Sequence, residues 1–460
     1  MLYDDTITAI ATPPGEGGIG IIRLSGPEAI AIISRIFVPA KPGPLRPFRL
    51  RYGTINDPQT QQPIDEVLVS VMRAPRSFTR EDVVEISCHG GPLPLQSILR
   101  LTLAEGARLA EPGEFTMRAF LNGRIDLSQA EATLDVIKAR TETALALAQA
   151  QLGGWLAQEV QRIRNALLEP LAYFTVLVDF PEDEVEAQDP LPVLQDAYDS
   201  IQKLLANADQ GIIYRQGAKV ALVGLPNVGK SSLLNRLLRS NRAIVTPIAG
   251  TTRDTLEETA NLAGIPVVLV DTAGITETDD LVEQIGVERS RSALAEADLA
   301  LLVLDSSQGI RPEDRAMIDL TSNKPTILVW NKSDLISDPP PHQEPLAPHI
   351  QEQVAISALT GQGIDSLTEA VAKILLGGRI TTPFDPAKTS RAVSNVRHRD
   401  ALARAAQHLA HVLTGYRQHD PTDLLTVDLT AALNALGEVT GETVGDDLLA
   451  TIFSKFCIGK

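Results

Sequence analysis

A loop with the spacing of a phosphate-binding site lies near the middle of the chain, at residues 224–231. It reads Gly-Leu-Pro-Asn-Val-Gly-Lys-Ser and fits the pattern G-x-x-x-x-G-K-[ST] without a mismatch. Backbone amides of such a loop surround nucleotide phosphates, and the helix that follows adds positive potential. Lys230 is expected to reach the β- and γ-phosphates, while the Ser231 hydroxyl holds Mg²⁺. The loop therefore predicts a nucleoside triphosphate site that also contains Asn227, Val228, Gly229 and Ser232.

Two later motifs predict that the bound base is guanine. Residues 331–334 read Asn-Lys-Ser-Asp, directly after a predicted strand at 326–330. The Asp334 carboxylate can accept hydrogen bonds from N1–H and the exocyclic amine of guanine, a donor pair that adenine lacks, so ATP is rejected. Residues 357–359, Ser-Ala-Leu, complete the pocket. The residues expected at the nucleotide base are Asn331, Lys332, Asp334, Ser357 and Ala358.

A fourth motif, Asp-Thr-Ala-Gly at residues 271–274, follows a predicted strand at 267–270. Asp271 is expected to hold Mg²⁺ through water, and the Gly274 amide to sense the γ-phosphate. Taken singly, the Asn-Lys-Ser-Asp, Ser-Ala-Leu and Asp-Thr-Ala-Gly motifs are weak, but all four motifs in order, each at the end of a strand, predict a GTPase. Ile275 stands where many small GTPases place the glutamine that orients the attacking water, so another residue takes that role or hydrolysis is slow.

The segments around these motifs have the pattern that would position them. From residue 215 to 378, apolar strands alternate with helical segments, which is typical of a doubly wound α/β fold. In such a fold ligands bind beyond the carboxyl ends of the strands, where all four motifs are expected. The strands are expected at 219–223, 267–270, 299–304, 326–330 and 353–356.

The flanking segments have a different character. Residues 1–120 alternate short apolar runs with Pro and Gly turns, which predicts an α+β domain. Residues 121–214 and 379–460 are expected to be helical. Within the first of these, apolar residues from Leu127 to Leu152 recur at spacings of three and four, which predicts one continuous helical face. The economical arrangement is a nucleotide-binding domain inserted into one split helical domain.

Composition excludes several classes of protein. The chain of 460 residues has 41 Lys and Arg against 58 Asp and Glu, a net charge of −17, so it is not a general polyanion binder. Aromatic residues make up 4%, which argues against single-strand binding by base stacking. Cys88 and Cys457 match no metal spacing, which argues against a disulfide framework or a zinc site. Residues 1–18 have the pattern of neither a signal peptide nor a transit peptide, and no apolar run reaches the length that spans a bilayer, so we expect a cytoplasmic location and no membrane.

Several further stretches resemble the MnmE (TrmE) family of tRNA-modification GTPases, and the resemblance extends over the whole chain. They are Thr-Pro-Pro-Gly at 12–15, Phe-Thr-Arg-Glu-Asp at 78–82, His-Gly-Gly-Pro at 89–92, Pro-Gly-Glu-Phe at 112–115, Ala-Gly-Thr-Thr-Arg-Asp at 249–254 and Phe-Cys-Ile-Gly-Lys at 456–460. The resemblance implies an N-terminal α+β, folate-binding-like domain at 1–120 that forms a homodimer. It further implies a helical-bundle domain at 121–214 and 379–460, and an inserted Ras-like P-loop α/β G domain at 215–378.

The resemblance also implies how hydrolysis is activated. In this family K⁺ and dimerisation of the G domains replace an arginine finger, because a cation offsets the charge that develops between the β- and γ-phosphates. The K⁺ ligands fall on Asn227, Thr246, Ile248 and Thr251, and the Mg²⁺ ligands on Ser231 and Thr252. The water-orienting glutamate falls on Glu283. Composition alone favours an ordinary solvated helix for the acidic residues 276–288, so the role of Glu283 rests on the resemblance.

A one-carbon tetrahydrofolate site is implied in the N-terminal domain. It falls on Arg23, Glu85, Arg124 and Lys460. The pterin edge, like guanine, presents a donor pair that a carboxylate such as Glu85 can accept, and the two arginines can bind the anionic tail of the folate. For Cys457 two interpretations stay open: the thiol assists chemistry on the uridine base, or it is a small residue that fixes the C-terminal tail.

The family acts with MnmG (GidA), a partner that uses FAD and NADH, to add an aminomethyl or carboxymethylaminomethyl group to C5 of the wobble uridine of certain tRNAs. One local basic cluster could contact tRNA, although a solvated helix face is the commoner explanation. It consists of Arg391, Arg397, His398, Arg399 and Arg404. The alternatives are a regulatory RNA- or ribosome-associated GTPase switch without modification chemistry, and a scaffold whose G domain only clasps a dimer. The intact phosphate, Mg²⁺ and guanine motifs argue against the scaffold.

Overall fold

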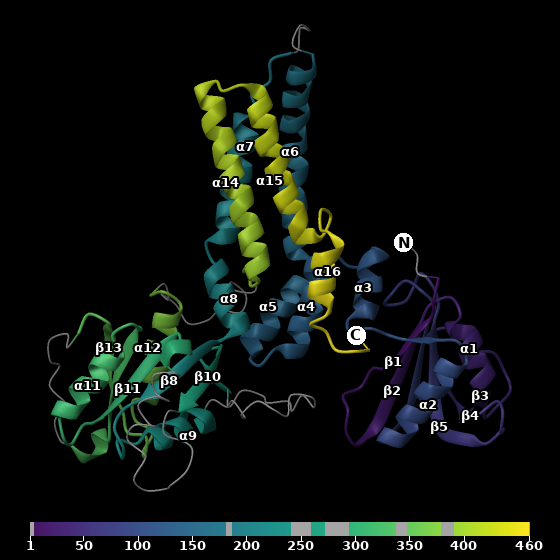
Figure 1. Ribbon diagram of the computed structural model, residues 1–460, viewed down its shortest axis with the longest axis horizontal. Helices are drawn as coiled ribbons and strands as arrows, with labels where there is room; N and C mark the ends of the chain where they lie inside the picture. The colour runs from purple at the N-terminus through teal and green to yellow at the C-terminus, as the bar shows by residue number, and fades with distance from the viewer. Residues whose placement is uncertain are drawn as a thin grey trace. The chain divides into compact units, whose positions relative to one another are not determined.

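The computed structural model describes residues 4–180, 186–240, 259–271, 294–336, 347–378 and 391–459 (Figure 1). Residue contacts divide the chain into two compact units. Of the described residues, the first unit holds 4–134 and 437–459, and the second holds the others. No helix within the described ranges is long and apolar enough to cross a membrane. The finer division into four segments stays a prediction.

A seven-stranded sheet forms the first unit, in the order β3-β4-β5-β6-β2-β1-β7. Neighbouring strands run antiparallel, except that β1 and β7 are parallel. The short apolar runs of the sequence at 6–10, 19–24, 66–72 and 82–86 fall in β1, β2, β5 and β6. The strands are β1 (Ile7–Ile10), β2 (Gly17–Ser25), β3 (Phe37–Pro39), β4 (Arg51–Asn56), β5 (Pro63–Met72), β6 (Val83–Gly90) and β7 (Arg108–Leu109).

One face of this sheet is apolar because side chains alternate along each strand. In β5, Val67, Val69 and Val71 are buried, whereas Leu68 between them is 39% exposed. Helices α1 (Ala29–Ile36) and α2 (Pro92–Ala104) contribute their own apolar side chains to the same core. Gly91 and Pro92 begin α2 directly after β6, and proline suits this first helical position because its missing amide is not needed there.

The C-terminal segment completes the first unit. Helix α16 (Asp446–Phe453) shares a hydrophobic core with the start of α4 (Leu127–Lys138), and residues of α3 (Glu114–Leu121) pack against it. The tail beyond α16 reaches the first strand, because a β-carbon on Gly459 would stand 2.4 Å from the Ile10 carbonyl oxygen. Gly459 also has φ of 95°, so this close approach requires glycine.

A six-stranded sheet lies in the second unit, in the order β13-β12-β11-β8-β10-β9. All neighbours are parallel except β9 and β10. The five predicted strands are all present, and β9 was missed. The order places β8, which precedes the phosphate loop, between β10 and β11, as a doubly wound fold requires. The strands are β8 (Ala218–Val223), β9 (Thr259–Leu262), β10 (Ile265–Asp271), β11 (Leu299–Asp305), β12 (Thr326–Asn331) and β13 (Ile350–Ala355).

Both faces of this sheet are buried, which explains why its strands are continuous apolar runs. Every residue of β11 is buried, and its side chains alternate between two hydrophobic cores. Helix α12 (Ile364–Leu375) covers one face and contributes to one core, to which α9 (Lys230–Ser240) adds Leu233 and Leu237. Helix α11 (Pro312–Leu320) contributes to the other core. The α/β and α+β sheets and the helices confirm the predicted fold class.

The prediction of one continuous helical face from Leu127 to Leu152 is wrong, because the chain breaks into α4 and α5 (Glu142–Leu152). Thr141 is the N-cap of α5: its hydroxyl accepts a hydrogen bond from the Ala144 amide at 3.1 Å and donates to the Gly264 carbonyl at 2.9 Å. The second bond is made to the connection between β9 and β10, so tertiary structure ends the first helix here.

The long helices of the second unit form a bundle (Figure 1). Helix α7 packs against both α6 and α14, and the rings of Phe174 and Tyr416 lie 6.0 Å apart between α6 and α14. A left-handed His419 ends α14 before the turn into α15. The helices are α6 (Trp155–Asp179), α7 (Leu191–Leu205), α14 (Val396–Gln418) and α15 (Thr422–Thr440), with the shorter α8 (Ala208–Gln216) leading into β8.

Candidate functional site

The phosphate loop connects β8 to α9 and has positive φ angles at three positions. Gly224, Asn227 and Gly229 have φ of 150°, 64° and 96°. A β-carbon on Gly224 would stand 2.4 Å from the Val303 carbonyl oxygen, so only glycine fits against β11. Asparagine is among the few other residues that adopt the left-handed region readily. These angles allow the tight turn from strand to helix that a loop around a phosphate requires.

Lys230 starts α9 and folds back over this loop. Its side chain is buried, and Nζ donates to the carbonyls of Gly224 at 2.8 Å and Leu225 at 2.9 Å. The ammonium group is therefore held at the loop that the motif assigns to phosphate. Ser231 and Ser232 follow in the first turn of α9, and Val228 is buried beneath the loop.

Asn331, at the end of β12, joins three of the predicted motifs. Its Nδ2 donates to the Val228 carbonyl at 2.8 Å, and its Oδ1 accepts from the Ala358 amide at 3.0 Å. The side chain is buried, and a β-carbon on Gly229 would stand 2.2 Å from Nδ2. The phosphate loop and the two loops expected at the base are thus connected through one amide.

Lys332 forms an ion pair with Asp305, the last residue of β11, at 2.7 Å. Burial alone would raise the pKa of Asp305, but hydrogen bonds from Lys332 and from Ser307 lower it below the ordinary value. Lys332 has φ of 64°, and this left-handed residue turns the chain from β12 into the helical turn Ser333–Leu335. The ion pair therefore holds the lysine stem at the edge of the sheet where the base is expected.

The remaining residues predicted at the base lie on two adjacent loops. Asp334 is exposed on the turn after β12, and Ser357 is buried and accepts from the Thr360 amide at 3.1 Å. Arg236 of α9 donates to the Ala358 carbonyl at 3.0 Å and to the Leu359 carbonyl. The sequence analysis did not predict that Arg236 and Asp305 contact this site. For Asp305 a signal was available, because the residue ends an apolar strand as other site residues do.

Part of the predicted site lies outside the described residues. Asp271 ends β10, so its backbone is placed at the carboxyl end of a strand that neighbours β8. The remaining predicted site residues lie outside the described ranges, and their roles stay predictions. These residues are Thr246, Ile248, Thr251, Thr252, Gly274, Glu283 and Lys460.

The residues predicted to bind folate lie in the first unit. Arg23 on β2 and Glu85 on β6 are paired in the sheet register, and Glu85 Oε1 accepts from Arg23 Nε at 2.9 Å and Nη2 at 2.8 Å. Arg23 Nη1 also donates to the Gly459 carbonyl at 3.1 Å, so the C-terminal tail reaches this pair. Arg124 is exposed after α3, and the Cys457 carbonyl accepts from the Gly113 amide at 3.4 Å.

The two cysteines differ in environment. Cys88 is buried in β6, as expected of a core residue, and burial together with Asp65 raises the pKa of its thiol to about 11. Cys457 is exposed on the C-terminal tail. A thiol available for chemistry is therefore Cys457 and not Cys88.

Family models match nearly the whole chain. The MnmE helical domain matches residues 127–457, and the N-terminus of the GTP-binding protein TrmE matches residues 6–124. This chain belongs to the MnmE family of tRNA modification GTPases. The boundary between the matches falls just after α3, and the helical-domain match extends across the G domain.

Relatives named tRNA modification GTPase MnmE match from end to end. The protein of Roseiflexus sp. (strain RS-1) is 60% identical and covers 100% of both chains. That of Chloroflexus aurantiacus is 62% identical, covering 99% of this chain and 100% of its own. The protein of Desulforamulus reducens is 47% identical and again covers 100% of both.

Two of the stretches that resemble the MnmE family supply a buried ionic network. Arg118 of α3 is fully buried and bonds Glu114 at 3.0 Å, Asp5 at 2.7 Å and Glu81 at 3.3 Å. Burial would raise the pKa of Glu114, but hydrogen bonds from Arg108, from the Glu111 amide and from Arg118 lower it below the ordinary value. Glu81 and Glu114 belong to stretches 78–82 and 112–115, so both stretches supply carboxylates that neutralise the buried Arg118 guanidinium, and loss of either would leave buried charge without its partner.

The basic cluster at the start of α14 does not form one exposed face. His398 is fully buried, and the Arg397 guanidinium lies 2.8 Å from its Nε2. Arg399 is paired with Asp209 at 3.1 Å and with Asp400 at 2.9 Å. The predictions for His398, either contact with tRNA or a solvated helix face, are therefore wrong, because α14 turns this residue into the bundle.

Proposed function

We propose that this chain, as a cytoplasmic homodimer, couples GTP hydrolysis to modification of C5 of the wobble uridine in certain tRNAs. The added group is aminomethyl or carboxymethylaminomethyl, and the partner is MnmG (GidA), a flavoprotein that holds FAD and uses NADH. Support comes from membership of the MnmE family and from Asn331, whose amide joins the phosphate loop to the loops expected at guanine.

Separate residues of the G domain bind the phosphates, the guanine base and Mg²⁺. Lys230, held over the phosphate loop by two carbonyls, moves its ammonium group to the β- and γ-phosphates when these enter. The exposed Asp334 accepts hydrogen bonds from guanine. Ser231 and Thr252 hold Mg²⁺, a cation that prefers oxygen ligands and neutralises phosphate charge when bound.

Asn227 fits the role of a K⁺ ligand. Its side chain carries an amide oxygen, the ligand class of hard cations, and its left-handed backbone fixes its place in the phosphate loop. Thr246, Ile248 and Thr251 complete this set, and bound K⁺ offsets charge that develops between the β- and γ-phosphates. Glu283 orients the attacking water, the role that Ile275 cannot fill.

The pair Arg23 and Glu85 fits a folate. Both side chains are partly exposed, at 21% and 29%, and they offer a cation and a carboxylate acceptor side by side. Arg124 and Lys460 add positive charge for the anionic tail. Tetrahydrofolate supplies the one-carbon unit when it is bound. The exposed Cys457 stands on the same tail that contacts Arg23, so its thiol is accessible to a substrate base.

The test is reconstitution with unmodified tRNA, the flavoprotein partner, NADH, a one-carbon tetrahydrofolate, GTP and K⁺, followed by analysis of the tRNA nucleosides. We expect a C5-modified uridine with the wild-type chain and none with Lys230→Ala. Lys219→Ala is the matched control, because Lys219 lies on β8 but pairs with Glu296 at 2.9 Å. If Lys230→Ala supports full modification, GTP hydrolysis does not drive the reaction. If no uridine changes although GTP is hydrolysed, the regulatory switch is the better description.

A further inference from the structure

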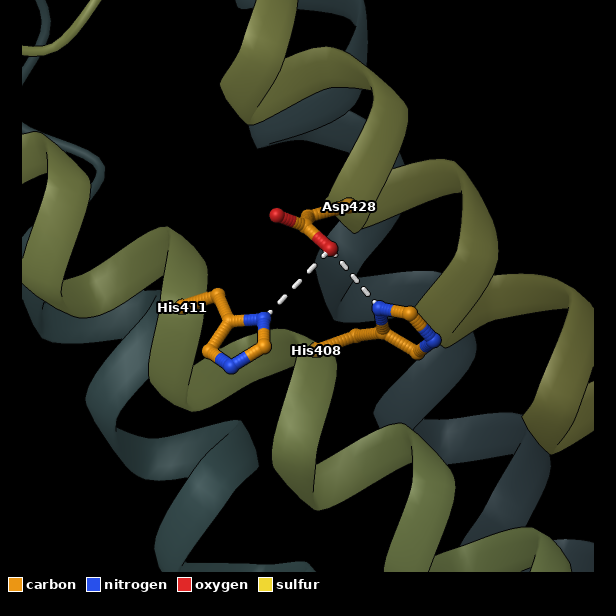
Figure 2. Close-up of side chains that lie close together, drawn as sticks. All are labelled: His408, His411 and Asp428. Atoms are coloured by element: carbon orange, nitrogen blue, oxygen red, sulfur yellow. Dashed lines mark hydrogen bonds and ion pairs between the residues drawn. The ribbon is translucent and has the colours of Figure 1, made fainter.

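Two histidines and one aspartate meet between α14 and α15, far in sequence from the motifs above. His408 and His411 are three residues apart on α14, a spacing that places them on one helix face, and Asp428 comes from α15. Figure 2 shows both imidazole rings directed toward the same carboxylate. Among the described residues, this is the group of three His, Cys, Asp or Glu side chains whose ligand atoms converge.

The distances match those of a small coordination sphere. Asp428 Oδ1 lies 2.7 Å from His408 Nδ1 and 3.8 Å from His411 Nδ1. One ligand atom from each of the three residues lies within 4.8 Å of the others. Bonds of 2.0–2.1 Å in a tetrahedral site separate neighbouring ligand atoms by about 3.3 Å. The observed separations bracket this value, so small side-chain rotations are enough to accommodate a metal ion.

An ordinary ion pair accounts for only part of the cluster. His408 and Asp428 alone would satisfy a His–Asp pair, as His89 and Asp65 do elsewhere in the chain at 2.6 Å. His411 adds a second imidazole that faces the same oxygen at a distance too long for a hydrogen bond. Its side chain is 57% exposed, so solvent or a further ligand can reach the remaining coordination position.

We propose that His408, His411 and Asp428 bind a divalent transition metal of the zinc class. Two imidazoles and a carboxylate suit Zn²⁺, Co²⁺ or Ni²⁺, whereas Mg²⁺ and Ca²⁺ prefer all-oxygen sites. Three protein ligands leave one position to water. The ion links α14 to α15 within the helical bundle, at a site separate from the Mg²⁺ and K⁺ ligands proposed in the G domain.

The test is titration of the full, untagged chain with Co²⁺ in the absence of nucleotide. We expect one equivalent to bind and to produce visible d–d absorption without the near-ultraviolet band of a cobalt–thiolate bond. A thiolate band would assign the ion to Cys457 or Cys88 and overturn the proposal. Zn²⁺ should displace Co²⁺ and raise the unfolding temperature, since a ligand that binds only the folded state stabilises it.

Variants separate a metal site from an ion pair. The His411→Ala variant keeps the His408–Asp428 pair, and α14 should still fold because the His411 side chain is exposed. The variant should nevertheless bind Co²⁺ about tenfold or more weakly, because it lacks one ligand. Asp428→Asn should do the same. His89→Gln, which disrupts the other His–Asp pair, is the matched control and should leave Co²⁺ affinity unchanged. Wild-type affinity in His411→Ala, or no binding to the wild-type chain at micromolar Co²⁺, would overturn the proposal.

Discussion

Asn331 Nδ2 donates a 2.8 Å hydrogen bond to the carbonyl of Val228, so the loop after β12 is tied to the phosphate loop after β8. Asn331→Ala leaves this buried carbonyl and the Ala358 amide without their partner, at a cost of about 1–3 kcal/mol for each buried group. We expect GDP and GTP affinity to fall by about tenfold or more, measured with a fluorescent nucleotide. Asn122→Ala removes a similar bond to the Thr79 carbonyl and is the control; equal affinity losses in the two variants would contradict the prediction.

Asp305 gives the G domain a pH-dependent contribution to stability. Its pKa is lower in the folded chain than the ordinary value, so its contribution is present above the pKa of an unfolded aspartate and is lost as pH falls through the folded pKa. Asp305→Asn should therefore lower the free energy of unfolding by about 1–3 kcal/mol near pH 7, and by less below about pH 4. Urea unfolding at both pH values measures this difference.

A matched control for that experiment lies on α11. Asp319 is exposed, so Asp319→Asn should change the free energy of unfolding little at either pH. A destabilisation by Asp305→Asn that is the same at both pH values would mean that the bond to Lys332 does not depend on the charge of Asp305.

K⁺ should accelerate GTP turnover relative to Na⁺ at equal ionic strength, because Asn227 offers an oxygen to a cation beside the phosphates. Asn227→Gly keeps a residue that tolerates φ of 64° but removes the side-chain oxygen, so it should abolish the difference between the two salts. Asn261→Gly, in strand β9 just before the turn into β10, is the control and should retain the difference between the two salts. Equal, slow turnover of the wild-type chain in both salts would remove K⁺ from the mechanism.

Glu283→Ala should nearly abolish GTP hydrolysis while leaving GTP affinity within a few-fold, since the proposed role of Glu283 is to orient water and not to bind nucleotide. The measurements are single-turnover hydrolysis and nucleotide binding at equilibrium. The control is Glu288→Ala, which removes another acidic residue of the same stretch; this variant should hydrolyse GTP at the wild-type rate. Normal turnover by Glu283→Ala would assign water orientation to another residue.

Glu85→Gln should weaken tetrahydrofolate binding by about tenfold, because the neutral amide is a poorer acceptor for the pterin donors and no longer charge-pairs with Arg23. Isothermal titration with a one-carbon folate measures the change. Glu105→Gln breaks the more exposed pair with Arg35 in the same domain and should leave folate affinity unchanged. If both variants bind folate as the wild-type chain does, the folate site is elsewhere.

The sequence predicted the G domain well because its signals are local. Buried strands such as β11 are unbroken apolar runs, and the phosphate loop is specified by residues adjacent in sequence. Strand β9 was missed, since its four residues Thr259–Leu262 include two polar ones and form a strand only by pairing with β10. The break at Thr141 was missed for a related reason: the residue that it contacts, Gly264, lies 123 positions away.

Charges that meet only in the folded chain were not predictable. Nothing near Arg118 in the sequence indicates that a fully buried guanidinium bonds Asp5, 113 residues earlier, and Glu81 as well. The bond between Lys332 and Asp305 likewise depends on the register of β11 beside β12. His408 and His411 carried a visible spacing on one helix, but Asp428 became their neighbour only when α15 folded back along α14.

The two-part construction of the first unit has a consequence for synthesis on the ribosome. About 300 residues separate Leu134 from Gly437, so at 5–20 residues per second the N-terminal domain waits on the order of 15–60 s for its last segment. During that interval Leu127 and Ala130 lack the cover of Phe453 and Phe456, and Arg23 lacks the Gly459 carbonyl. The domain that is begun first is finished last, and a chain that stalls during translation leaves it with an open apolar surface for chaperones to bind.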